Sequence, residues 1–383
     1  MSKVSSMICG AAVLAAVLAE GCATQKHDTV ATSNFVGPAS VPKKDRVLWE
    51  YRNGLSAMRK GDFATAKQLF DDALLTLQGV YGKDVSAKKA RNYFNEESKK
   101  NFLGEPYERV MAYWYRGIMY WMDGEPDNAR ACFKSAQLMD SDAENKEYAA
   151  DYASLEYLDG YASVKLNGDG SDSLQRAQKL SKIGQLPPYD KDANVLVFLE
   201  FGNGPTKYAT GQHGQELRFH TPPSQIKGAW VRIANKKIRI GPYDDLDFQA
   251  MTRGGRVMDH VLANKAVFKD VTGTAGTTAM ITGGAIAASQ RGDAQIAGLG
   301  LLAAGVITSI VSGATTPAAD TRSWDNLPQY LSFASLELAP GTYDGAVDFT
   351  DAAGNVVLTK TFKFTTPAPN GHDAVIFLSD KST

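Results

Sequence analysis

Hydrophobic residues change their pattern along the chain near Pro187 and Pro188. Beyond this point they form short runs of strand length, first the continuous apolar run of residues 194–201 (NVLVFLEF) and then runs that alternate with polar residues. Further strands are predicted over residues 215–220, 229–234, 236–240, 331–338, 343–349, 356–364 and 374–378. A predicted helix over about residues 245–269 lies between two strand-rich arms, which we expect to pair into one sheet or sandwich. Residues 187–383 are therefore predicted to form an α+β domain.

The first half of the chain has helical periodicity and carries a recurring set of small and aromatic residues. Two copies of the set occur: Gly54, Ala66 and Phe70, followed by Gly117, Ala129 and Phe133. These offsets match a tetratricopeptide unit, in which small residues let paired helices approach and an aromatic residue fills the groove between neighbouring helix pairs. Residues 45–186 are thus predicted to form tetratricopeptide-like helical repeats, with a charged insertion over residues 83–101 and a degenerate third pair over residues 147–183.

Aromatic residues crowd one of the predicted helices. Four of them are candidates for binding a partner: Tyr107, Trp114, Tyr115 and Trp121. One interpretation places this stripe in the core of the repeats, and the other lets part of it line a concave groove for a peptide or a partner helix. Tetratricopeptide folds usually bind other proteins, although a fold by itself does not fix a function.

A Gly/Ala-rich segment over residues 272–316 interrupts the second half. Its small residues recur at four-residue spacing, as in Ala275, Ala279 and Gly283, and this spacing lets two helices touch backbone to backbone. We therefore expect an inserted helical hairpin, because glycine and threonine at this density would leave an isolated helix weak in water. Three alternatives are open for this hairpin. It could be buried in its own domain, it could contact a partner or another copy of the chain, or it could insert into a membrane.

The N-terminus has the pattern of an export signal. Lys3 precedes an apolar run over residues 7–19 that is too short to span a bilayer. The sequence from Leu18 to Cys22 (LAEGC) resembles the lipobox of bacterial lipoproteins, with Glu20 in place of the usual small residue. This resemblance implies a signal peptide over residues 1–21, lipid attachment at Cys22 and an outer-membrane, periplasm-facing location. The polar residues 22–44 are predicted to form a flexible tether.

Composition and motifs narrow the classes of function. Lysine and arginine number 41 against 42 aspartates and glutamates, so no overall charge indicates a nucleic-acid partner. The sequence carries no phosphate-binding loop, zincin motif, paired CxxC motif or nucleophile elbow, and we predict no cofactor, no metal site and no enzymatic activity. A separate alternative is an enzyme that acts on cell-wall material through Asp320, Arg322 and His372.

A dense group of hydrogen-bonding residues, AADTRSWDNLP, follows the Gly/Ala-rich segment at residues 318–328. Asp320, Arg322 and Trp324 are expected to act as a structural clasp, with both Arg322 and Trp324 largely buried and Trp324 capping the hairpin. This group and the later PGTY motif resemble a signature of a family of uncharacterised bacterial lipoproteins with tetratricopeptide-like N-terminal halves. The resemblance implies a role in the cell envelope, but it does not carry an activity or a catalytic residue over to this chain.

The sequence therefore predicts an α+β protein with tetratricopeptide-like repeats, a strand-rich domain and an inserted hairpin. Its predicted function is that of a lipid-anchored envelope scaffold, which binds a protein partner through its helical repeats in peptidoglycan or outer-membrane maintenance. The alternative is a membrane-active or oligomer-forming protein that uses the hairpin over residues 272–316.

Replacing Cys22 with Ala separates these two functions. We expect Cys22→Ala to release the protein from the membrane fraction without detergent, because the lipid provides the anchor. Cell fractionation measures the release, and Cys132→Ala is the control that should stay with the membrane. Tight membrane association of Cys22→Ala would contradict lipid anchoring and support insertion of the hairpin.

Overall fold

The computed structural model describes residues 40–81, 101–141, 149–182, 186–212, 214, 216–252, 319–368 and 371–382. Nearly all of them belong to one compact unit, Pro42–Thr383. The predicted signal peptide with Cys22, nearly all of the charged insertion and the Gly/Ala-rich hairpin lie outside the described residues. Within the described ranges, no helix combines the length and hydropathy that a membrane crossing requires.

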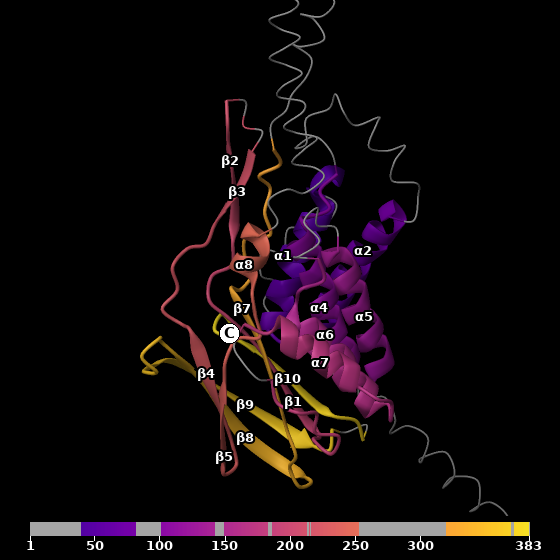
Figure 1. Ribbon diagram of the computed structural model, residues 1–383, viewed down its shortest axis with the longest axis vertical. Helices are drawn as coiled ribbons and strands as arrows, with labels where there is room; N and C mark the ends of the chain where they lie inside the picture. Colours follow the sequence, from indigo (N-terminus) through magenta and orange to yellow (C-terminus); the bar gives the residue numbers. More distant parts are fainter. Residues whose placement is uncertain are drawn as a thin grey trace, which may run out of the picture. The chain divides into compact units, whose positions relative to one another are not determined.

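Six helices in the first half of this unit form three successive pairs (Figure 1). After the short 3-10 helix η2 (Lys43–Asp45), they are α1 (Arg46–Arg59), α2 (Phe63–Tyr81), α4 (Pro106–Met122), α5 (Pro126–Asp140), α6 (Ala153–Lys165) and α7 (Ser171–Leu180).

The first two helix pairs are closed by equivalent contacts. A Cβ atom on Gly54 would lie 3.1 Å from the ring of Phe70, and one on Gly117 would lie 2.7 Å from the ring of Phe133. Each glycine thus admits the aromatic ring of the opposite helix, and its small size allows the close approach of paired helices that the sequence predicts. The turns within both pairs contain a glycine with positive φ, a conformation that side chains with a Cβ atom rarely adopt.

Two four-stranded sheets form most of the second half. The first has the order β10-β1-β7-β6, made of β10 (Ala374–Ser379), β1 (Val195–Phe201), β7 (Tyr330–Leu336) and β6 (Asp244–Asp245). The second has the order β5-β4-β8-β9, made of β5 (Lys236–Ile240), β4 (Gly228–Ile233), β8 (Gly341–Thr350) and β9 (Val356–Thr366). The two predicted strand-rich arms do pair, β1 with β7 and β10 in one sheet and β4 with β8 in the other.

The described part of the second half also contains two smaller elements. The ribbon of β2 (Thr206–Thr210) and β3 (Glu216–His220) is a separate two-stranded sheet. Helix α8 (Leu246–Met251) is the described part of the helix predicted over about residues 245–269.

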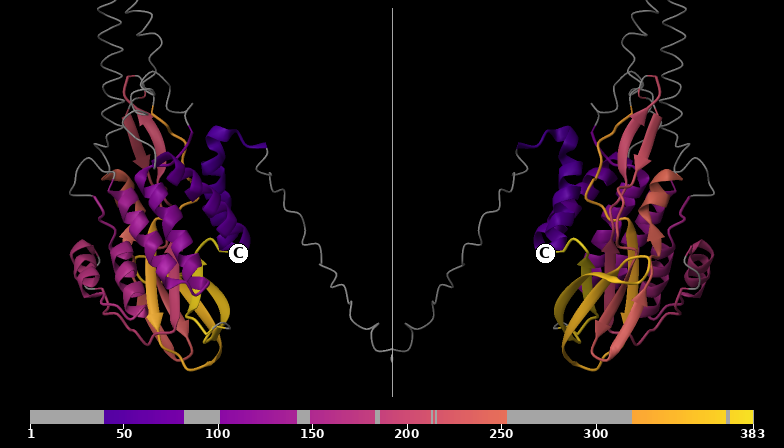
Figure 2. Two further views of the ribbon diagram at one scale, coloured as in Figure 1. Left: turned by 90° about the vertical axis from the view of Figure 1, so that its right-hand side faces the viewer. Right: turned by 90° about the vertical axis from the view of Figure 1, so that its left-hand side faces the viewer.

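Strand β1 is buried on both faces because it lies in the middle of three layers (Figures 1 and 2). Val195, Val197 and Leu199 face the second sheet, with which they form one apolar core. Leu196 and Phe198 face the helices and belong to the core of the helical half. A strand covered on both faces needs a continuous apolar sequence, which accounts for the run NVLVFLEF.

The helices and the first sheet share the core to which Leu196 and Phe198 belong. It joins α1, α4 and α6 to residues of β1, β7 and β10, such as Phe198, Phe333 and Phe377. The predicted boundary between residues 186 and 187 therefore separates two kinds of secondary structure within one compact unit.

One acidic residue, Glu200, interrupts the apolar face that β1 turns toward the helices. Its carboxylate is fully buried and accepts hydrogen bonds from the Arg59 guanidinium of α1, at 2.6 Å, and from the Tyr115 hydroxyl of α4. Burial and the charge of Glu200 raise the pKa of Tyr115 well above its ordinary value, so the phenol stays a donor. This cluster joins the sheet to two helices through a compensated buried charge.

Asp244 connects the sheet to a third helix. Its two carboxylate oxygens accept hydrogen bonds from the backbone N–H groups of Ala153 and Ser154, at 2.9 and 2.8 Å, at the start of α6. Burial raises the pKa of Asp244 to about 6. Asp244 therefore caps a helix of the other half, whereas its neighbour Asp245 caps α8 by accepting from the Asp247 N–H group.

We predict that Glu200→Ala lowers the free energy of unfolding by about 3–5 kcal/mol, because the buried guanidinium of Arg59 loses its counter-charge. Urea denaturation followed by circular dichroism measures the change. The double variant Arg59→Ala/Glu200→Ala should cost less than the sum of the two single variants.

The control is Glu216→Ala, which removes a carboxylate from an ion pair with Arg218 in which both side chains are about half exposed. We expect it to change stability by less than about 1 kcal/mol. A cost of Glu200→Ala as small as that of the control would contradict the role of the buried cluster.

Candidate functional site

The candidate site is built around the segment Ala319–Pro328, here called the clasp segment, which runs along α1. Trp324 is fully buried and stacks on Tyr51 of α1, with 4.4 Å between ring centroids and 20° between ring planes. Phe70 and Tyr115 complete its surroundings, each with 6.0 Å between centroids. Trp324 thus packs into the aromatic core of the helices, whereas the hairpin that it was expected to cap lies outside the described residues.

Arg322 joins the clasp segment to the start of the helical half. Its guanidinium forms ion pairs with Asp320, at 2.6 Å, and with Asp45, at 2.7 Å, and it also donates to the carbonyl of Lys44. The side chain is 16% exposed. Burial alone would lower the pKa of Arg322, but the hydrogen bonds that it donates to the two carboxylates raise the pKa above its ordinary value. Arg322 is therefore a permanent cation held between two acidic residues.

A second ion pair lies beneath the clasp segment, between Lys207 of β2 and Glu108 of α4. Both side chains are almost fully buried. Lys207 also donates to the carbonyl of Arg322 at 2.9 Å, and Glu108 accepts from the backbone N–H of Trp324 at 2.7 Å. Burial lowers the pKa of Lys207 and raises that of Glu108, while their mutual attraction opposes both shifts. The pair fixes the backbone on both sides of Ser323.

Arg52 supplies the third basic side chain. Its guanidinium donates to the carbonyl of Ser323 at 2.7 Å and to the carboxylate of Asp325 at 3.0 Å. The Asn326 amide donates in return to the carbonyl of Arg52 at 3.0 Å. These contacts hold the clasp segment along one face of α1.

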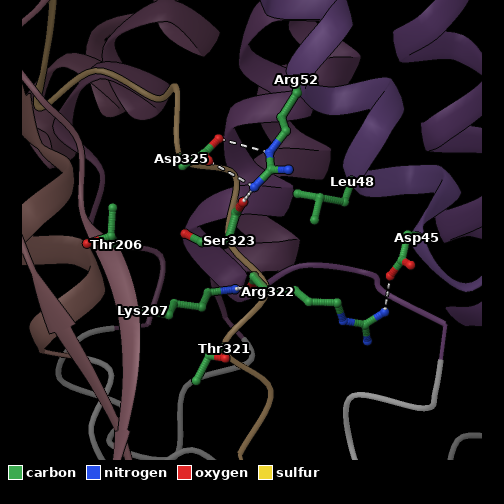
Figure 3. A pocket seen from close by; sticks show the side chains of 9 residues that line it. All are labelled: Asp45, Leu48, Arg52, Thr206, Lys207, Thr321, Arg322, Ser323 and Asp325. Carbon is green, nitrogen blue, oxygen red and sulfur yellow. Dashed lines mark hydrogen bonds and ion pairs between the residues drawn. The ribbon is translucent and has the colours of Figure 1, made fainter. Parts of the chain in front are cut away.

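These side chains line an open pocket of about 530 Å³ between α1, β2 and the clasp segment (Figure 3). Its three cations are Arg52, Lys207 and Arg322, and a carboxylate pairs with each of them. A phosphate or carboxylate ligand would have to displace these ion pairs, and Lys207 is only 2% exposed, so its amine is shielded from a substrate. The arrangement suits a structural joint better than anion binding or amine chemistry.

The three residues of the enzymatic alternative do not come together. Asp320 and Arg322 lie beside the first turn of α4, where Glu108 is located. His372 packs against Gly124, just beyond the last turn of the same helix. Trp121, in the last turn, follows Glu108 by thirteen positions, which correspond to about 20 Å of helix. Asp320, Arg322 and His372 therefore cannot act on one substrate, which corrects that interpretation.

The four aromatic candidates for partner binding belong to the interior. At most 1% of each residue is exposed to solvent in all four, which are Tyr107, Trp114, Tyr115 and Trp121. Trp114 and Trp121 contact Phe198 of β1, and Tyr115 contacts Phe377 of β10. The chain's own sheet occupies the groove that these residues were expected to offer, so they are corrected to core residues.

Sequence analysis missed the residues that connect the clasp segment to the rest of the molecule. These are Arg52, Glu108 and Lys207. Glu108 lies in a strongly apolar helix, PYERVMAYWYRGIMYWM, and Glu200 lies in the apolar run of β1. An acidic residue inside an otherwise apolar element is a signal for a buried ion pair, although it does not identify the partner.

No family model matches the chain, and neither curated proteins nor solved structures contain a match to it. Any functional conclusion therefore depends on the residues and their arrangement.

We predict that Arg322→Ala lowers the free energy of unfolding by about 1–3 kcal/mol, because Asp45 and Asp320 lose the guanidinium that pairs them. Trp324→Ala should cost about 3–5 kcal/mol through the cavity it leaves. Urea denaturation measures both. Arg218→Ala, which removes a half-exposed guanidinium, is the control. A loss with Arg322→Ala no larger than with Arg218→Ala would rule out the clasp.

Proposed function

We propose that this protein is a lipid-anchored component of the cell envelope that serves as a protein–protein interaction scaffold. Its helices α1 to α7 are interpreted as tetratricopeptide-like repeats, and its location as the periplasm-facing side of the outer membrane. The lipobox-like sequence before Cys22 and the resemblance of the clasp segment to envelope lipoproteins support this proposal. Peptidoglycan or outer-membrane maintenance is the process that the resemblance suggests.

The observation that carries the proposal is the division of the helices into an inner and an outer row. The inner helices α1, α4 and α6 share the core with the first sheet, so their inward face has no room for a partner. The outer helices α2, α5 and α7 pack against the inner row (Figure 1). Among the described residues, the two most exposed large hydrophobic side chains are Leu75 on α2, at 70%, and Leu138 on α5, at 66%.

A partner is therefore proposed to bind the outer row, at a surface that includes Leu75 and Leu138. Isolated exposed leucines are common on proteins, but these two lie on successive helix pairs of a stack. A stack of helix pairs presents its outer helices side by side, and this arrangement lets a partner contact several of them.

A second candidate function, oligomerisation or membrane insertion through residues 272–316, is favoured by the position of the residues that flank this region. Asp247 of α8 accepts a hydrogen bond from Thr221, just after β3, and the Ala319 N–H donates to the Gly214 carbonyl at 2.7 Å. One flank thus contacts the end of the β2–β3 ribbon at Thr221, and the other contacts the turn between the two strands at Gly214. Fractionation of Cys22→Ala distinguishes this function from the scaffold.

The scaffold is tested with the double variant Leu75→Asp/Leu138→Asp. We expect the amount of partner that is chemically cross-linked to the protein in intact cells to fall at least tenfold, because charged residues replace the apolar contacts. The stability of the protein should stay unchanged. The control is Thr76→Asp/Ala131→Asp, which adds the same charges to exposed positions of the same two helices. Equal cross-linking in the double variant and the control would contradict the proposed surface.

A further inference from the structure

The outer edge of β9 is an unpaired strand edge of unusual length. Strand β9 spans Val356–Thr366 and is the last strand of the sheet β5-β4-β8-β9. Its inner edge pairs with β8 from Val356 to Thr366, with a β-bulge that leaves Val357 without a partner in β8. Within the described ranges, no strand pairs with its outer edge. An edge of eleven residues offers a row of backbone N–H and C=O groups that can pair with another strand.

The opposite edge of the same sheet is shorter and carries more positive charge than β9. Strand β5 has only five residues, and Lys236, Lys237 and Arg239 are exposed on it. Short length and exposed positive charge both discourage edge-to-edge pairing. One sheet thus has one protected edge and one open edge.

The side chains of β9 that point away from the core are mostly neutral. Val357, Thr359, Thr361 and Thr365 are exposed on this face, and Lys363 is its one charged residue. Lys360, the other lysine of the strand, turns its amine to the carbonyl of Ser382. Val356 and Val357 are 58% and 42% exposed. Threonine and valine favour strand pairing, so this face suits contact with a second strand.

We propose that β9 pairs with β9 of a second copy of this chain, antiparallel and centred on Thr361. The two second sheets then form one continuous eight-stranded sheet across a two-fold axis. This interface is isologous, so the same residues serve both copies and the assembly closes as a dimer.

The sequence of β9 is complementary to itself in this register. On the outer face, Val357 lies opposite the partner's Thr365, and Lys363 lies opposite the partner's Thr359. On the inner face, Leu358 lies opposite the partner's Phe364. Cross-strand pairs of β-branched and aromatic residues stabilise antiparallel strands, and no two lysines face each other.

Other registers are less favourable. Centring the pair on Lys360 or on Lys363 places two lysines directly opposite each other, which is destabilising. A shift by an odd number of residues between the strands would point inner side chains to the outer face. Centring on Phe362 avoids both problems but shortens the overlap. Thr361 is the middle residue of Val356–Thr366, so the proposed register gives the longest overlap of the two strands, with the bulge at Val357 near one end.

This dimer does not depend on the proposed scaffold function, since none of its residues lies on the helices. It is tested on the full chain carrying Cys22→Ala, so that no lipid contributes to association. Sedimentation equilibrium should show a monomer–dimer equilibrium, and Thr361→Lys should raise its dissociation constant at least tenfold. Thr361→Lys puts two like charges on the two-fold axis while its exposed side chain leaves the monomer intact.

Thr76→Lys is the matched control, since it adds the same charge to an exposed threonine of α2 and should leave the dissociation constant unchanged. A chain that stays monomeric at all concentrations would overturn the proposal. This also holds for a monomer that binds an extended peptide at the edge of β9. A dimer that Thr361→Lys leaves intact would overturn it as well.

Cysteine cross-linking tests the register. Residues directly opposite in an antiparallel pair have Cα atoms about 4.5–5.5 Å apart, within the range of a disulfide. In a background with Cys9→Ala and Cys22→Ala, Thr361→Cys should form a covalent dimer under mild oxidation. Thr365→Cys should not, because its two copies would lie about 27 Å apart along the strands. Equal cross-linking of the two variants would overturn the register.

Discussion

The fold depends on one constraint, which is the complete burial of β1 between two apolar cores. Every residue of this strand is withdrawn from water, so the helices and the second sheet must both be present to cover it. Glu200 makes the requirement on the helical side specific. Its buried carboxylate needs the Arg59 guanidinium and the Tyr115 hydroxyl, and these come from two different helices. Apolar packing alone would allow the helices to slide over the sheet, whereas a buried ion pair fixes their position. We infer that this is why the two halves behave as one compact unit.

The clasp segment repeats this principle at the other end of the helical half. Charged groups of α1, α4 and β2 meet the backbone of residues 322–326, and the ring of Trp324 fills the space beneath them. The clasp segment is more than 250 residues from α1 in the sequence, and it leads directly into β7. Its ion pairs therefore set where β7 begins relative to the helices, and β7 in turn lies against β1. The polar joint and the buried strand support each other.

Sequence patterns captured the local elements of this protein and missed most of its long-range pairs. The strands β1, β3, β4, β5 and β7 to β10 lie within two residues of their predicted bounds, because apolar runs and alternation depend on neighbouring positions alone. The close approach of paired helices at Gly54 and Gly117 was equally predictable, because small residues recur there at the same offsets. The rings that these glycines admit, Phe70 and Phe133, were instead expected between neighbouring helix pairs. The aromatic stripe of α4 was ambiguous because periodicity identifies an apolar face without identifying what covers it. Strand β2 was missed, since TKYAT is half polar and its key residue, Lys207, is paired with Glu108 ninety-nine positions away. Such partners are chosen by the tertiary fold and leave no local trace.

The parallel pairing of β1 with β10 has a consequence for how the chain acquires its structure. β1 comes near the middle of the sequence, whereas β10 follows every other described helix and strand. A chain emerging from a ribosome or a translocation channel therefore cannot complete the first sheet until residues 374–379 have appeared. Until then the apolar residues of β1 lack one neighbour, and the pairing that finally covers them spans a long loop, which slows folding. The topology thus delays closure of the core until β10, the last of the described strands, has been synthesised.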